Sequence, residues 1–289
     1  MEGEHIKGSP FTVTVKLPVQ KLSTPIQIIT EMKRPWGVAV NQRGDIIVAN
    51  YSGHCVSVFS SSSEKLYSFS SHGLGCGNVY CPRGVAVGSD GNILVADGNH
   101  FISKFTLDGK FIKMVGEMGS NALEFKRPMG VGVHPYTTQV YVADCENRRI
   151  QILNSDLTFS NSFGSGHLNK PWDVAFDSTG DVYVVDRGNH CIQVFTVVGQ
   201  FMRKFGSEGE RNGELNLPTS ISIDNDNVVY VTEDGNHRVS VFTCEGKFMT
   251  AFGTMGSGPG QFTDPRGIAV DSNGIVIVSD HENNRLQFF

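Results

Sequence analysis

The sequence predicts an all-β protein, a six-bladed β-propeller of four-stranded antiparallel blades, from two observations. The first is a phrase close to Pro-x-Gly-Val-Ala-Val that occurs six times, with successive prolines 47, 46, 43, 47 and 47 residues apart. The second is that each repeat holds four short β patterns with no convincing helical period. Repeats of this kind are typical of propeller blades. The prolines that open the phrases are Pro35, Pro82, Pro128, Pro171, Pro218 and Pro265.

The four strands of a repeat can be justified in order. The first is the Gly-Val-Ala-Val run, as at 37–40, whose small residues suit the crowded centre of a ring. Turns of residues that accept positive φ follow, as at 89–92. The second strand is β-branched and ends in an acid or amide, as at 182–186. The third strand alternates, as at 191–195, and the fourth resembles 110–115.

The two ends of the chain indicate how the ring closes. The sixth repeat stops at Phe289, at the end of its third strand, so its outer strand is missing. An unassigned strand pattern lies before the first repeat, at 24–30. We expect this segment to complete the last blade, because closure removes an open sheet edge. The propeller is therefore predicted to span 24–289, with 17–23 as a linker.

Composition excludes several classes of protein. The chain has 289 residues, no run of 18 apolar residues and a polar start at 1–7, which predicts neither a membrane span nor a secretory signal. The net charge of −5 argues against a protein that coats DNA or RNA non-specifically, but it allows a local basic patch. Six cysteines do not make a disulfide scaffold, so we expect reduced thiols and a cytoplasmic location without a membrane partner.

The repeated phrase, the acidic end of the second strand and an Asn-His pair before the third strand resemble the NHL repeat family. The linking segments at 205–209 and 258–262 are also similar to this family, and the resemblance covers roughly 24–289. The pairs are Asn99-His100, Asn189-His190 and Asn236-His237.

Residues 1–16 carry a second resemblance. From Gly3 to Val15 they look like the last strand of a filamin-type immunoglobulin domain. Filamin followed by NHL is the C-terminal order of tripartite-motif NHL ubiquitin ligases, so the resemblance implies part of a larger ligase. The RING, B-box and coiled coil of that family are absent from the sequence, and no paired Cys-x2-Cys motifs remain to bind zinc. Ligase catalysis is therefore not expected in this chain.

The candidate binding residues are those that follow the proline in each phrase, since they should ring the mouth of the central channel. Large aromatic residues and arginine at an exposed rim anchor protein partners, and they also stack on and neutralise single-stranded nucleic acid. In order they are Trp36, Arg83, Met129, Trp172, Thr219 and Arg266. Cations lie nearby at Lys33, Arg34, Lys126, Arg127 and Lys170. As exposed charges, Arg83 and Arg266 are expected to contribute little to stability. The alternative interpretation is that the tryptophans plug the channel and the arginines are solvated or paired.

The charges divide the two faces of the predicted ring. The turns that join the first strand to the second and the third to the fourth carry many more acids than bases. The opposite face has about as many bases as acids, with the bases closest to the channel. We therefore expect an anionic or acidic partner to dock on that opposite face.

The remaining groups of polar residues are interpreted as structural rather than as catalytic or metal-binding. The histidines of the Asn-His pairs are interpreted as turn residues with a repeated hydrogen-bonding role, and the acids that end the second strands as acceptors for turn N–H groups. His134 lies in a first-strand pattern, where the other repeats offer no further ligands. No nucleophile elbow, phosphate loop or HExxH motif occurs. We predict no cofactor, no metal and no catalytic residue.

These observations predict a protein-interaction propeller, the substrate-recognition part of a tripartite-motif NHL ubiquitin ligase-like protein. Its partner would be a protein or ubiquitination substrate. One alternative is sequence-selective binding of single-stranded or hairpin RNA on the same face. Another is a metal-dependent hydrolase or lyase, because related propellers include such enzymes. The net charge of −5 and the mixed charges on the outer part of the face favour protein over RNA.

Overall fold

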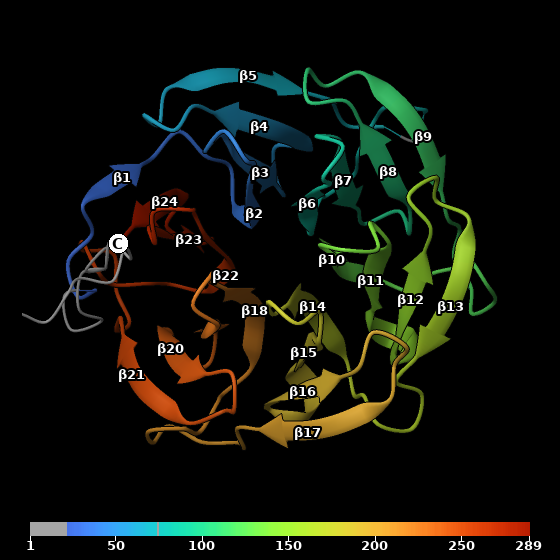
Figure 1. Ribbon diagram of the computed structural model, residues 1–289. Helices are drawn as coiled ribbons and strands as arrows, with labels where there is room; N and C mark the ends of the chain where they lie inside the picture. The colour runs from blue at the N-terminus through green and yellow to red at the C-terminus, as the bar shows by residue number, and fades with distance from the viewer. Residues whose placement is uncertain (1–21, 74) are drawn as a thin grey trace, which may run out of the picture.

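Six four-stranded sheets form a ring, with the first strand of each blade innermost (Figure 1). The computed structural model describes residues 22–73 and 75–289. Neighbouring strands within every sheet are antiparallel. The predicted six-bladed β-propeller is confirmed.

The blades follow one another in chain order, and each runs from its inner to its outer strand. Blade 1 contains β2 (Pro35–Val40), β3 (Ile46–Asn50), β4 (Cys55–Phe59) and β5 (Lys65–Phe69). Blade 2 contains β6 (Val85–Val87), β7 (Ile93–Ala96), β8 (Ile102–Phe105) and β9 (Phe111–Val115). Blade 3 contains β10 (Pro128–Val133), β11 (Val140–Asp144), β12 (Arg149–Leu153) and β13 (Phe159–Phe163). Blade 4 contains β14 (Pro171–Phe176), β15 (Val182–Asp186), β16 (Cys191–Phe195) and β17 (Phe201–Phe205). Blade 5 contains β18 (Pro218–Ile223), β19 (Val228–Glu233), β20 (Arg238–Thr243) and β21 (Phe248–Phe252). Blade 6 contains β22 (Pro265–Val270), β23 (Val276–Asp280), β24 (Arg285–Phe288) and β1 (Gln27–Ile29). Short 3-10 turns, η2 (Cys145–Asn147) and η3 (Arg187–Asn189), follow β11 and β15.

The ring is closed by the N-terminal strand, as predicted. β1 pairs antiparallel with β24, with Gln27 opposite Phe288 and Ile29 opposite Leu286. In Figure 1 the blue β1 lies on the outer side of the red β24, so the two ends of the propeller share one blade. Ile29 is buried in the same cluster as Leu286 and Phe288. The filamin-like segment 1–16 and linker residues 17–21 lie outside the described residues.

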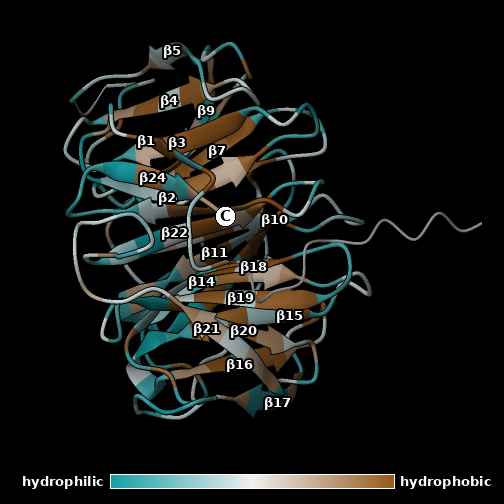
Figure 2. Ribbon diagram, turned by 90° about the vertical axis from the view of Figure 1, so that its left-hand side faces the viewer, coloured by the Kyte–Doolittle hydropathy of each residue, from teal (hydrophilic) through white to brown (hydrophobic). Residues whose placement is uncertain are grey.

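The hydrophobic core lies between neighbouring blades. One cluster combines Tyr141 and Ile150 of blade 3 with Val174 and Phe195 of blade 4, all of them buried. In Figure 2 the strands are mostly brown, whereas much of the loop surface at the two faces is hydrophilic. Each blade therefore buries apolar surface against its neighbours, and the repeats stabilise one another around the ring.

Adjacent inner strands approach one another closely at the centre. The Gly37 N–H donates to the carbonyl of Arg83 over 2.8 Å, which joins blades 1 and 2 directly. A Cβ atom on Gly130 would collide with the backbone of Trp172 and Asp173. The repeated glycine is thus required by the neighbouring blade rather than by a turn. Blades 4 and 5 meet differently, since Asp173 accepts hydrogen bonds from the Ser220 hydroxyl and from the backbone N–H of Ile221.

Buried acids at the ends of the second strands hold the loops in place. Asp280 is fully buried and accepts hydrogen bonds from the backbone N–H of Thr263, from Asn283 and from Arg285. Asp144, Asp186 and Glu233 are buried with equivalent partners. The prediction that these acids accept hydrogen bonds from the turns is confirmed.

The described segments contain no helix of the length and hydrophobicity that a membrane crossing needs. All six cysteines have free thiols.

Loss of β1 should open the ring. A chain that starts at residue 31 leaves the hydrogen-bonding edge of β24 unpaired, and we expect aggregation or a melting temperature lowered by about 5 °C or more. A chain that starts at residue 22 retains β1 and serves as the control. Equal melting curves for the two chains would contradict closure by β1.

The second prediction concerns the glycine of the repeated phrase. Gly130→Val should lower the free energy of unfolding by about 1–3 kcal/mol, because the new side chain has no room beside blade 4. Gly75→Val is the control, since an added Cβ there meets only the end of the Asn78 side chain at 3.5 Å. Urea unfolding measures both variants. A Gly130→Val protein as stable as wild type would show that the inner strands have room for side chains.

Candidate interaction surface at the channel mouth

Five of the six inner strands begin at a proline, and in blade 2 Pro82 lies three residues before β6. The face of the ring on which these prolines lie is called the proline face. The residues before these prolines have left-handed backbone angles, with φ between 46° and 60°. In several blades their N–H groups donate to a side chain from the preceding blade, as from Arg127 to His100 Nδ1 and from Leu217 to His190 Nδ1. The histidines of the Asn-His turns therefore join neighbouring blades, and the predicted structural role is confirmed for His100 and His190.

Trp36 and Trp172 close the channel on the proline face. They come from blades 1 and 4, which lie opposite each other in the ring, yet their ring centroids are only 5.9 Å apart. Beneath them is a hollow of about 30 Å³, lined by all six of the predicted mouth residues. The prediction that these residues surround the channel is confirmed, and the tryptophans plug it.

Several of the predicted mouth residues have little exposed surface. Met129 is 1% exposed, Thr219 is 4% exposed and Trp172 is 7% exposed. The ring faces of the tryptophans are also covered. Arg187 lies 4.0 Å from the ring centroid of Trp172, and Arg266 lies 4.7 Å from that of Trp36. The aromatic residues therefore act as packed supports for cations at the mouth.

Arg266 is held by two carboxylates. Its Nη2 lies 2.5 Å from Asp264 and 3.7 Å from Asp234, and its side chain is 13% exposed. Arg187 also pairs with Asp234, at 2.7 Å. The expectation that Arg266 is an exposed charge of little importance for stability is wrong, because the loop before β22 and the turn after β19 surround it with acids.

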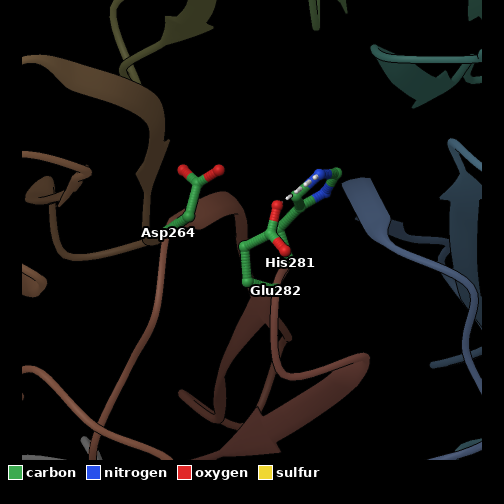
Figure 3. Close-up of side chains that lie close together, drawn as sticks. All are labelled: Asp264, His281 and Glu282. Atoms are coloured by element: carbon green, nitrogen blue, oxygen red, sulfur yellow. Dashed lines mark ion pairs between the residues drawn. The ribbon is translucent and has the colours of Figure 1, made fainter.

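A second cluster lies beside this network and consists of Asp264, His281 and Glu282 (Figure 3). One ligand atom from each residue lies within 4.8 Å of the others, so this group has the residue types of a cation site. The carboxylates, however, already pair with arginines, Asp264 with Arg266 and Glu282 with Arg34 at 2.9 Å. The positive charges that a metal ion would supply are thus supplied by guanidinium groups.

Burial sets the protonation states in this cluster. It lowers the pKa of His281 to about 4, so the imidazole is neutral at pH 7. His281 Nδ1 then carries its proton and donates to the carbonyl of Pro35 over 3.1 Å. Burial likewise raises the pKa of Asp264 to about 6, against the opposing effect of Arg266. This cluster and Arg187 were not predicted from the sequence. The available signal was the acid before Pro265, where three of the other five repeats carry a cation.

Blades 3 and 4 present a different set of charges, which we call the basic sector. Lys126 and Lys170 have no ion pair among the described residues, and Lys170 is exposed. Arg127 is exposed and has only Glu146 near it, at 3.9 Å. Arg148 is exposed on the turn after β11. Lys33, on the loop before blade 1, is also exposed. Within residues 22–73 and 75–289, these cations therefore have no carboxylate closer than the 3.9 Å between Arg127 and Glu146, and Lys126 is half-buried.

The expectation that Arg83 is an exposed charge is also wrong, because its side chain is half-buried at the channel mouth. It has no ion pair among the residues that the structure describes, and two of its nitrogen atoms are buried without a hydrogen-bond partner. Burial, followed by the like charge of Arg127, lowers the pKa of Arg83. This guanidinium therefore adds to the positive potential of the mouth.

The two kinds of arginine should respond differently to substitution. Arg266→Met leaves Asp234 and Asp264 facing each other without their shared cation, and we expect a loss of about 3 kcal/mol in the free energy of unfolding. Arg127→Met removes an exposed charge and should change it by about 0.5 kcal/mol or less. Urea unfolding of both variants is the measurement. Equal losses would contradict the buried network.

Comparison with known proteins identifies a repeat family in five of the six blades. The NHL repeat model matches residues 32–59, 79–105, 168–195, 215–242 and 262–289, which lie in blades 1, 2, 4, 5 and 6. The chain is 31% identical over 140 residues to Protein brain tumor of Drosophila melanogaster, covering 48% of this chain and 14% of that protein. It is 30% identical over 139 residues to B-box type zinc finger protein ncl-1 of Caenorhabditis elegans, covering 47% of this chain and 16% of that protein.

Solved structures agree on the fold. A streptogramin B lyase structure superposes with a TM-score of 0.67 at 15% identity, covering 90% of this chain and 94% of that chain. At this identity the likeness concerns architecture alone. The chain is also 32% identical over 109 residues to the human NHL repeat-containing protein 3, covering 31% of that protein. The chain thus spans less than a third of the length of each of these relatives. The chain therefore carries NHL repeats on a six-bladed propeller.

Proposed function

We propose that this chain is the protein-interaction propeller of a tripartite-motif NHL ubiquitin ligase-like protein, which recognises a protein partner or ubiquitination substrate on the proline face. The main support for this proposal is the set of cations in the basic sector. Lys126, Arg127, Arg148 and Lys170 are cations on neighbouring loops without close internal carboxylate partners. Charged side chains that the fold does not use are available for a partner.

The acids of the opposite face also support docking on the proline face. Many of its acids cap their own turns, as Asp156 does with Thr158 and Asp108 with Thr106 and Lys110. These carboxylates are already occupied by local hydrogen bonds. The relative whose name includes a B-box zinc finger supports the ligase context. The free cysteines support the proposed cytoplasmic location.

An enzymatic role has less support. The channel mouth is closed by Trp36 and Trp172, and the carboxylates beside it are paired with arginines. The lyase neighbours share only the architecture. We therefore propose binding, without chemistry, as the function of this chain.

Photocrosslinking in cells tests the proposal. A photoreactive amino acid is placed at Lys33 or Glu210, which are exposed on the proline face, or at Gln42 or Ser272, which are exposed on the opposite face. Protein and RNA adducts are recovered separately. We expect protein adducts from the first pair and few from the second. Adducts mainly from Gln42 and Ser272, or adducts of RNA alone, would contradict the proposal.

A further inference from the structure

We propose that the hollow between blades 3 and 4 at the channel mouth binds a glutamate or aspartate side chain of an acidic protein segment, which lies across the basic sector. This inference rests on the proposed protein-interaction function and names the chemistry of its partner. The hollow has a volume of about 340 Å³. Its lining residues are Trp36, Arg127, Cys145, Glu146, Lys170, Trp172, Arg187 and Arg266.

The charge of the hollow suits a carboxylate. Four of its lining residues are cations and one, Glu146, is an acid. Arg187 and Arg266 are neutralised by Asp234 and Asp264 behind them, so they are fixed in position. Arg127 and Lys170 supply the remaining positive charge, since only Glu146 lies near Arg127 and at the long distance of 3.9 Å. A single carboxylate would complete the charge balance.

The floor of the hollow suits the stem of such a side chain. Trp172 and Cys145 are 7% and 2% exposed and present apolar atoms. Burial raises the pKa of the Cys145 thiol to about 11, so this residue is uncharged. The methylene groups of a glutamate would contact this floor while its carboxylate meets Arg127 and Lys170 at the rim.

The same geometry disfavours RNA. Single-stranded nucleic acid needs uncovered aromatic faces on which bases stack. At this mouth Trp172 is covered by Arg187 at 4.0 Å, and Trp36 packs against Tyr51 at 5.0 Å and Arg266 at 4.7 Å. Glu146 is exposed beside the mouth and would repel a continuous run of phosphates. An acidic peptide places its charges at fewer points and avoids this repulsion.

The only two tryptophans of the chain both lie at the mouth, so their fluorescence reports directly on the site. The probe is the peptide acetyl-Gly-Glu-Glu-Gly-Glu-Glu-Gly-amide, titrated into the full chain. We expect a saturable change in tryptophan emission that weakens as salt is added. The same peptide with glutamine in place of glutamate should give no saturable change, and a uridine octanucleotide should bind more weakly than the acidic peptide.

Substitution localises the effect. Arg127 and Lys170 have φ values of 55° and 60°, so asparagine, which tolerates this backbone, is the replacement that removes charge with little strain. Arg127→Asn with Lys170→Asn should weaken acidic peptide binding by about tenfold or more. The matched control is Lys65→Asn with Lys247→Asn, two exposed cations on the opposite face, which should leave binding unchanged.

Several results would overturn the inference. They are no emission change with the acidic peptide, equal binding of the glutamine peptide, tighter binding of the RNA, or equal binding by the two double variants. A circular dichroism melt checks that both variants are folded. If photocrosslinking from Lys33 and Glu210 still captures protein in these cases, the proposed function stands and only the acidic-partner inference fails.

Discussion

The close approach of the six inner strands is the constraint on which this structure depends. Glycine in the repeated phrase lets neighbouring backbones touch, as where Gly37 donates to the carbonyl of Arg83. The residue before each glycine then has only the channel mouth to occupy. Because the channel is narrow, Trp36 and Trp172 meet across it although they come from opposite blades. The requirement for tight packing at the centre thereby creates the plugged mouth and the cation supports around it.

The mouth is electrostatically uneven. On the side of blades 5 and 6, Asp234 and Asp264 compensate arginines and make a rigid network. On the side of blades 3 and 4, Arg127 and Lys170 lack comparable partners. Cations without a close carboxylate partner, held next to a rigid network, favour recognition of an acidic partner. Such a partner supplies the negative charge, and the site does not have to rearrange first. The side of blades 3 and 4 therefore suits an acidic partner better than the side of blades 5 and 6.

The fold and the position of the site could be predicted from the sequence because both follow from a repeating phrase. The period of the phrase predicted the blades, and the missing strand of the sixth repeat predicted closure. The residue after each proline was placed at the channel mouth. Plugging of the channel by the tryptophans was one of two alternatives that the sequence left open. Burial of Met129 could not be predicted, because it depends on contacts between blades that lie far apart in the sequence. The roles of Arg187 and Asp234 were missed since they lie in turns outside the phrase.

Hydrogen exchange of the full chain, with and without a protein captured through position 33, tests most directly that the proline face is the docking surface. The account predicts slower exchange in residues 126–129, 145–149 and 168–172, the loops of the basic sector. It predicts no change at 88–92 and 271–275, which lie on the opposite face. Protection confined to those two turns would contradict it.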